Sequence, residues 1–211
     1  MLIKSPKTQR GATLLELLLS LALGVTAITA LAGLVGYGMG VNANLLSSSR
    51  VNEELGNLML MIQRDVRRAG YSGNTLAMVG DPAANPSPFA NSIAIGAYPG
   101  EAANSCILFS YDNDNNGVLD AVAGNNENFG YRLRDGQVEM RVNSLLCVDD
   151  GWLVLSDPDT INVTGLTFVL NQIVENNVTS NEITLTLQGE LATNNAISRR
   201  FDSSFVVRNY D

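Results

Sequence analysis

The chain has 211 residues, of which 45% are hydrophobic, and a formal net charge of -8. It contains no histidine, and no lysine follows Lys7, which excludes His-based catalytic triads, His-ligated zinc and lysine Schiff bases from the body of the chain. Acids outnumber cations 21 to 13, so the chain also lacks a basic footprint for nucleic acid. We therefore expect a non-enzymatic protein with no nucleic-acid partner.

An apolar segment runs from about residue 12 to residue 41, and Glu16 is its only acidic or basic side chain. In a helix, about 20 apolar residues are enough to cross the hydrocarbon of a bilayer. Three cations precede the segment and the next one is Arg50, so the positive-inside rule places the N-terminus in the cytoplasm and the body outside. The alternative is a cleaved secretory signal peptide. The length of the apolar segment and the acid within it argue against this alternative.

A second helical pattern continues from the apolar segment to Gly70, a residue type typical of helix ends. Apolar residues recur in it every three or four positions, which predicts one buried stripe. The stripe consists of Val51, Leu55, Leu58, Met59, Ile62, Val66 and Ala69. We predict one long helix over residues 12–70, whose second half is amphipathic and covers a sheet.

Residues 71–211 show the alternation of half-buried antiparallel strands. The clearest hairpin is "FGYRLRDGQVEMRV", residues 129–142, with Asp135 and Gly136 at the turn. Further strands are predicted in "CILFSY", "GWLVLS", "INVTGLTFVL", "NEITLTLQGEL" and "RRFDSSFVVRN", and a long surface connection with one short strand is predicted over residues 74–104. The expected fold class is α+β, a long N-terminal helix packed on an antiparallel β-sheet domain.

Two cysteines, Cys106 and Cys147, lie in the part predicted to be outside the cytoplasm. In an oxidising compartment a disulfide between them is the expected state, and two buried thiols are the alternative.

The stretch "YDNDNNGVLD", residues 111–120, matches the first half of a calcium loop, in which alternate residues present oxygens and Gly117 permits the sharp turn. The glutamate expected at position twelve is replaced by Ala123, and the flanks are not helical, so the loop is no EF-hand. The alternative is a solvated turn rich in Asp, Asn and Gly. The predicted calcium ligands are Asp112, Asp114, Asn116, Val118 and Asp120, with Glu127 as a substitute for the missing glutamate if the loop runs longer.

The start of the chain, with its basic leader, Gly11, "ATLLE" and an apolar helix, resembles the class III leader of type IV pilins and type II secretion pseudopilins. The resemblance implies that residues 1–11 are a leader, that a prepilin peptidase cuts between Gly11 and Ala12, and that Ala12 is then N-methylated. The usual residue after the cut is Phe, so Ala12 is a departure from the pattern. Glu16 takes the position of the family's acid, which is expected to pair with the N-terminal amine of its own or a neighbouring subunit.

Several later stretches resemble PilW-type minor pilins: "MLMIQRDVRRAGYSG", "ILFSYDNDNNG", "FGYRLRDGQVEMR", "GWLVLSDP" and "FVVRN". The resemblance implies a structural subunit that primes or joins a pilus fibre, with other minor and major pilins as partners. It also implies residence in the bacterial inner membrane, with a periplasmic body, before assembly into the fibre. The alternatives are a minor pseudopilin of a type II secretion system and a membrane-anchored, calcium-dependent adhesin.

Overall fold

The computed structural model describes residues 11, 13–81, 83–175 and 178–207. The chain divides into two compact units, one up to Leu46 and the other from Ser47 onward, and helix α1 (Leu14–Val66) contributes to both. The fold class is α+β, as predicted.

The first unit contains the apolar part of α1. Among the described residues α1 is the one helix long and apolar enough to cross a membrane, and the side chains of its most apolar stretch are exposed. Its serine and threonine hydroxyl groups donate within the helix, Ser20 Oγ to the carbonyl of Leu17, Thr26 Oγ1 to that of Leu23 and Thr29 Oγ1 to that of Thr26. The segment can therefore enter an apolar medium without leaving these hydroxyl protons unpaired.

The second unit begins with the amphipathic part of α1, whose predicted stripe from Val51 to Ala69 is buried. The α-helix ends at Val66, earlier than the predicted Gly70. Residues 67–70 form turns instead, because the Gly70 N–H donates to the carbonyl of Ser110 on a neighbouring strand at 2.9 Å. Gly70 has a φ of 79°, the left-handed conformation expected where a helix stops.

A five-stranded antiparallel sheet has the strand order β1-β2-β5-β6-β7. Its strands are β1 (Ala94–Gly96), β2 (Cys106–Ser110), β5 (Asn128–Arg134), β6 (Gln137–Met140) and β7 (Leu153–Val154). The predicted hairpin is confirmed in β5 and β6, and its turn residues Asp135 and Gly136 have φ values of 50° and 75°. Two consecutive positive φ values are those of a type I′ turn, which suits the twist of paired strands.

A separate three-stranded sheet has the order β10-β9-β8, so the strands form more than the single predicted sheet. Its strands are β8 (Ile161–Glu175), β9 (Val178–Leu191) and β10 (Asn194–Val207). A turn connects β7 to β8, and in it Asp157 accepts hydrogen bonds from the side chain of Thr160 and the backbone of Asp159. The remaining elements are α2 (Thr75–Gly80), which lies in the predicted long connection, and a small hairpin of β3 (Ala121–Val122) and β4 (Asn125–Asn126).

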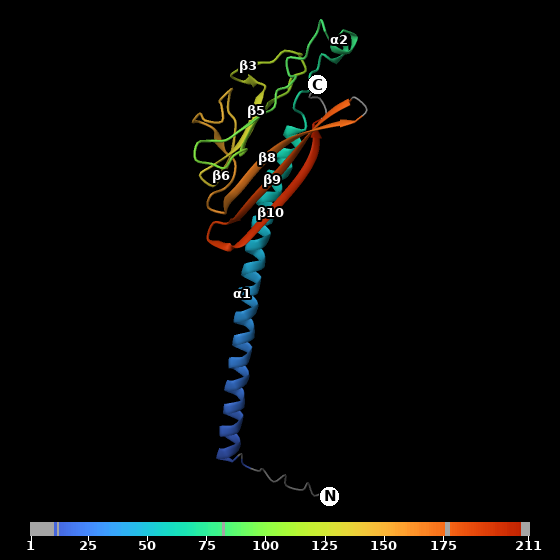
Figure 1. Ribbon diagram of the computed structural model, residues 1–211. Helices are drawn as coiled ribbons and strands as arrows, with labels where there is room; N and C mark the ends of the chain where they lie inside the picture. The colour runs from blue at the N-terminus through green and yellow to red at the C-terminus, as the bar shows by residue number, and fades with distance from the viewer. Residues whose placement is uncertain (1–10, 12, 82, 176–177, 208–211) are drawn as a thin grey trace, which may run out of the picture. The chain divides into compact units, whose positions relative to one another are not determined.

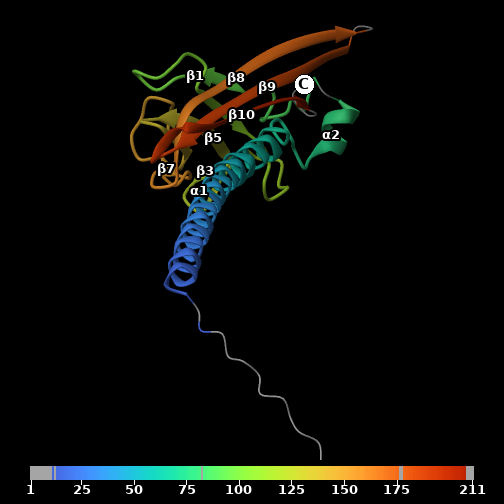
Figure 2. The same cartoon turned by 90° about the horizontal axis from the view of Figure 1, so that it is seen from below.

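The core of the second unit lies between α1 and the sheets. Strands β8, β9 and β10 run side by side along the part of α1 that follows Ser47 (Figure 1 and Figure 2). Helix and sheet approach closely at Gly189, where an added Cβ would lie 2.9 Å from Leu55 Cδ2. Tyr131 on β5 reaches the helix, and its hydroxyl donates to Asp65 Oδ2 at 2.6 Å. Burial is the main reason that the pKa of Tyr131 is raised, so this hydroxyl stays protonated.

Candidate functional site

The first candidate residue, Glu16, lies in the first turn of α1 and forms a capping box with Thr13. The Thr13 N–H donates to Glu16 Oε2 at 3.1 Å, and the Glu16 N–H donates to Thr13 Oγ1 at 3.3 Å. The two residues thus satisfy two N–H groups that a helix start leaves free, and the carboxylate lies at the positive end of the helix dipole. The Thr-x-x-Glu spacing in "TLLE" is the sequence signature of this motif, although we did not predict it.

Gly11, the residue before the predicted cleavage point, is exposed, and apart from its chain neighbours no atom of the described residues lies within 4 Å of the place where its Cβ would be. Ala12, the residue after it, lies outside the described residues.

The second candidate site is a cluster of acids in the loop that follows β2. One carboxylate oxygen from each of Asp112, Asp114 and Glu127 lies within 4.8 Å of the other two, and we call this set the acidic cluster. The small β3–β4 hairpin reverses the chain and returns Glu127 to the start of the loop. Asp112 and Glu127 are fully buried, whereas Asp114 is exposed.

Backbone amides hold both buried carboxylates. Asp112 Oδ2 accepts hydrogen bonds from the N–H groups of Gly73 at 2.7 Å and Gly117 at 2.8 Å. Glu127 accepts from the N–H of Asn113 at 2.6 Å and from that of Asp120 at 3.1 Å.

These contacts set the charge state of Asp112. Burial works to raise the pKa of its carboxyl group, but the backbone N–H groups around it, first that of Gly73, outweigh burial and lower the pKa. Asp112 is therefore a buried anion at neutral pH.

The other predicted ligands lie around the acidic cluster rather than within it. Asn116 Nδ2 donates hydrogen bonds to Asp114 Oδ2 at 3.1 Å and to Asp120 Oδ2 at 3.0 Å. Its Oδ1 accepts a hydrogen bond from the Val118 N–H. Asn125 bridges the same two carboxylates at 3.0 and 2.8 Å. The sequence does not predict the place of Asn125, because only the β3–β4 hairpin brings this residue beside the loop.

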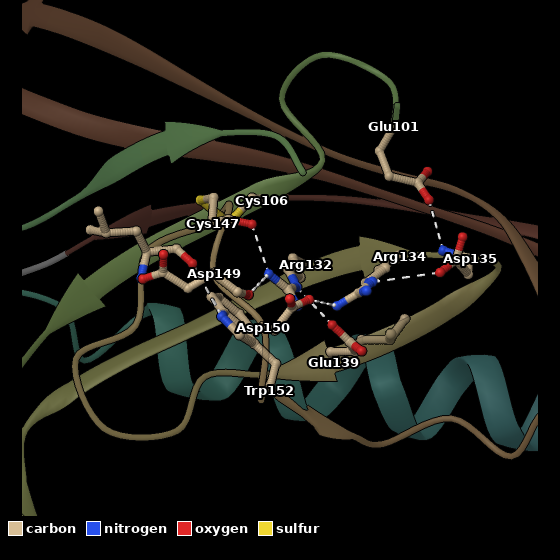
Figure 3. Close-up of polar contacts among 12 residues, drawn as sticks. Glu101, Cys106, Arg132, Arg134, Asp135, Glu139, Cys147, Asp149, Asp150 and Trp152 are labelled. Atoms are coloured by element: carbon tan, nitrogen blue, oxygen red, sulfur yellow. Dashed lines mark hydrogen bonds and ion pairs between the residues drawn. A yellow bond between two sulfur atoms is a disulfide. The ribbon is translucent and has the colours of Figure 1, made fainter. Parts of the chain in front are cut away.

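The predicted disulfide between Cys106 and Cys147 is present and closes a sequence separation of 41 residues. It holds the loop after β6 over one face of the five-stranded sheet, where Arg132 is fully buried (Figure 3). Arg132 Nε donates to Glu139 Oε2 at 2.6 Å, and its Nη1 donates to the carbonyls of Cys147 at 2.7 Å and Asp149 at 2.6 Å. This contact network is not predictable from the sequence, since an arginine alternating with apolar residues in a strand predicts an exposed side chain.

The long helix, whose apolar first half is long enough to cross a membrane, and the disulfide-closed β domain packed on its second half are the features of a pilin-like protein. A family model described as PpdB, prepilin peptidase-dependent protein B, matches residues 44–207, and the chain belongs to this family. The matched region begins after the apolar segment, so family membership does not depend on the leader-like start. No curated protein and no solved structure matches the chain.

Proposed function

We propose that the protein is a minor type IV pilin of the PilW type, a structural and non-enzymatic subunit that takes part in initiating or assembling the pilus fibre. The observation that carries the proposal is α1 itself. One continuous helix has an exposed apolar half suited to a bilayer or a filament core, and a second half whose stripe closes the core of the β domain. The family match over residues 44–207 supports the same class of protein.

In this proposal residues 1–11 are the leader and the N-terminus faces the cytoplasm while the body is periplasmic. A prepilin peptidase cuts between Gly11 and Ala12, and Ala12 is N-methylated. Both capping-box residues, Thr13 and Glu16, lie after the cut, so processing leaves the helix start intact. Cleavage creates a new amine on Ala12, the residue before Thr13, and in this proposal the Glu16 carboxylate pairs with that amine or with the amine of a neighbouring pilin. Such a pair specifies axial register, because a misaligned subunit leaves two desolvated charges unpaired.

The test is to replace Glu16 in cells that assemble filaments. Glu16→Ala should leave membrane insertion and leader cleavage unchanged, while the amount of this subunit in purified filaments falls. Glu53→Ala is the matched control, because Glu53 is an exposed acid on the same helix beyond the apolar segment. Mass spectrometry of the N-terminus measures cleavage and methylation in the same samples. Normal incorporation of the Glu16→Ala subunit would contradict the docking role.

A minor pseudopilin of a type II secretion system shares this helix and β domain. Deletion of the gene separates the two proposals, since loss of pili supports the pilin and loss of secretion supports the pseudopilin.

The acidic cluster favours a second candidate, a calcium-dependent binding protein whose anchor stays in the bilayer. That candidate predicts an uncut leader and absence from filaments. Under either function we propose calcium as the cofactor, because the cluster offers only oxygen ligands.

A further inference from the structure

One buried oxygen of the acidic cluster has no partner. Asp112 Oδ2 is occupied by two backbone N–H groups, but Asp112 Oδ1, which is also buried, has no hydrogen-bond partner among the described residues. An unpaired carboxylate oxygen away from water is costly, and native structures rarely keep one unless an ion or water satisfies it. Asp112 belongs to the set whose oxygens lie within 4.8 Å of one another, so one cation would serve all three acids.

The charge around this oxygen is also uncompensated. In the described part of the chain, no salt bridge includes Asp112, Asp114 or Glu127. The nearby Asp120 adds a fourth carboxylate, which asparagine amides connect to Asp114. Neutral amides compensate negative charge poorly compared with a cation.

We propose that a calcium ion binds between Asp112, Asp114 and Glu127, and that the ion fastens the segment after α1, residues 71–74, to the 112–127 loop. The inference deepens the calcium part of the proposed function and does not depend on the filament role. Calcium fits because the donors are carboxylate oxygens on a loop, and calcium accepts irregular geometry with six to eight oxygens, the remainder coming from water. Zinc does not fit, since the chain has no histidine and both cysteines are in the disulfide.

The fastening follows from contacts that cross between the two segments. The Asp112 N–H donates to the carbonyl of Tyr71 at 2.8 Å, and the Tyr71 hydroxyl donates to Asn115 Oδ1 at 2.8 Å. The Gly73 N–H donates to Asp112 Oδ2, the carboxylate that also offers its free oxygen to the ion.

The two backbones also approach closely. A Cβ at Gly73 would lie 2.8 Å from the Cα of Asn115, and a Cβ at Gly117 would lie 2.6 Å from the Cβ of Asn74. An ion that orders the loop therefore also orders residues 71–74, which connect the end of α1 to the rest of the β domain.

The experiment uses the full chain in detergent micelles after removal of divalent ions. Calorimetric titration with calcium chloride measures binding, and thermal unfolding with calcium or magnesium measures stabilisation. Hydrogen exchange measures the protection of residues 71–74. At calcium about 100-fold above its Kd we expect the Tm to rise by about 5 °C or more, and exchange in residues 71–74 to slow.

Asp114→Asn is the informative variant, because Asp114 is exposed and the change keeps its shape while removing one charge. We expect its calcium affinity to fall by about tenfold or more, since affinity in such loops follows the number of charged ligands. Asp159→Asn is the matched control, an exposed acid in the turn before β8 that should bind calcium as the unmodified chain does.

Absence of heat and of any Tm shift at about 10 mM calcium, beyond the weak end of known extracellular sites, would overturn the site. Equal affinity in Asp114→Asn and Asp159→Asn would overturn the ligand assignment, and equal stabilisation by magnesium would overturn calcium as the ion. Binding with unchanged exchange in residues 71–74 would overturn the fastening alone. None of these outcomes bears on filament incorporation, which the Glu16→Ala experiment tests separately.

Discussion

The buried Arg132 provides the sharpest stability prediction. Its guanidinium is fully buried, makes a 2.6 Å ion pair with Glu139 and contacts two aromatic rings, 4.8 Å from the centroid of Tyr98 and 4.5 Å from that of Trp152. Arg132→Met keeps much of the apolar contact but leaves the Glu139 carboxylate without its cation. It also leaves the carbonyls of Cys147 and Asp149 without a donor.

The expected cost of Arg132→Met is about 3 to 5 kcal/mol, the range for removing one partner of a buried ion pair. That is a large fraction of a typical domain stability of about 5 to 15 kcal/mol. The double variant Arg132→Met/Glu139→Leu should recover most of the loss, because it leaves no unpaired buried charge. Urea unfolding of the full chain in micelles, followed by fluorescence, measures the stability of the single and the double variant, since Trp152 is the only tryptophan and lies against Arg132.

Arg200→Met is the matched control. Arg200 also makes a close ion pair, with Asp202 at 2.9 Å, but the two side chains are 60% and 51% exposed. Its loss should lower the free energy of unfolding far less than the loss of Arg132 does, because water screens an exposed ion pair. If Arg132→Met costs as little as Arg200→Met, or if the double variant is no more stable than the single one, the reasoning about burial is refuted.

Two further predictions concern the disulfide and one carboxylate. Replacing Cys106 and Cys147 by Ser should lower the free energy of unfolding by about 4 kcal/mol, from the loop entropy of a 41-residue separation, and an unchanged urea midpoint under oxidising conditions would contradict it. The hydrogen bond from Arg200, with a second one from Thr186, lowers the pKa of Asp202 to about 2, below its ordinary value of 3.8. The stabilisation from this depressed pKa is present above about pH 4 and is lost as the pH falls through about 2. NMR titration should show the Asp202 midpoint moving up toward 4 in Arg200→Met, and an unmoved midpoint would exclude the ion pair as the cause.

Periodicity was sufficient to predict the helix and its buried face. The stripe from Val51 to Ala69 is buried as predicted, because spacings of three and four place residues on one face of any α-helix. The Asp135–Gly136 turn was equally predictable, since few residue pairs adopt two positive φ values easily. The helix end at Val66 was not predictable, because the Gly70 N–H donates to the carbonyl of Ser110, a residue 40 positions away in the sequence.

The capping box and the buried arginine were missed for different reasons. Thr13 and Glu16 form a local motif whose Thr-x-x-Glu spacing is visible in the sequence alone, so the capping box is predictable without the structure. Arg132 lies on the face of β5 opposite Tyr131 and Leu133, and alternation predicts that face to be exposed. The disulfide-bonded loop covers this face of β5. The residues around Arg132 in the sequence do not indicate that a distant loop buries it.

By itself the sequence determined the apolar segment, the long helix, the β-rich body, the cysteine pair and the loop rich in Asp and Asn, because each depends on periodicity, turn chemistry or composition within a few residues. Tertiary structure decided which groups meet. The acidic cluster joins Glu127 to Asp112 and Asp114 through the β3–β4 hairpin, and Gly73 reaches Asp112 across 39 positions. Such long-range contacts depend on how sheets, loops and helix pack together, which is why only the folded chain shows the site complete.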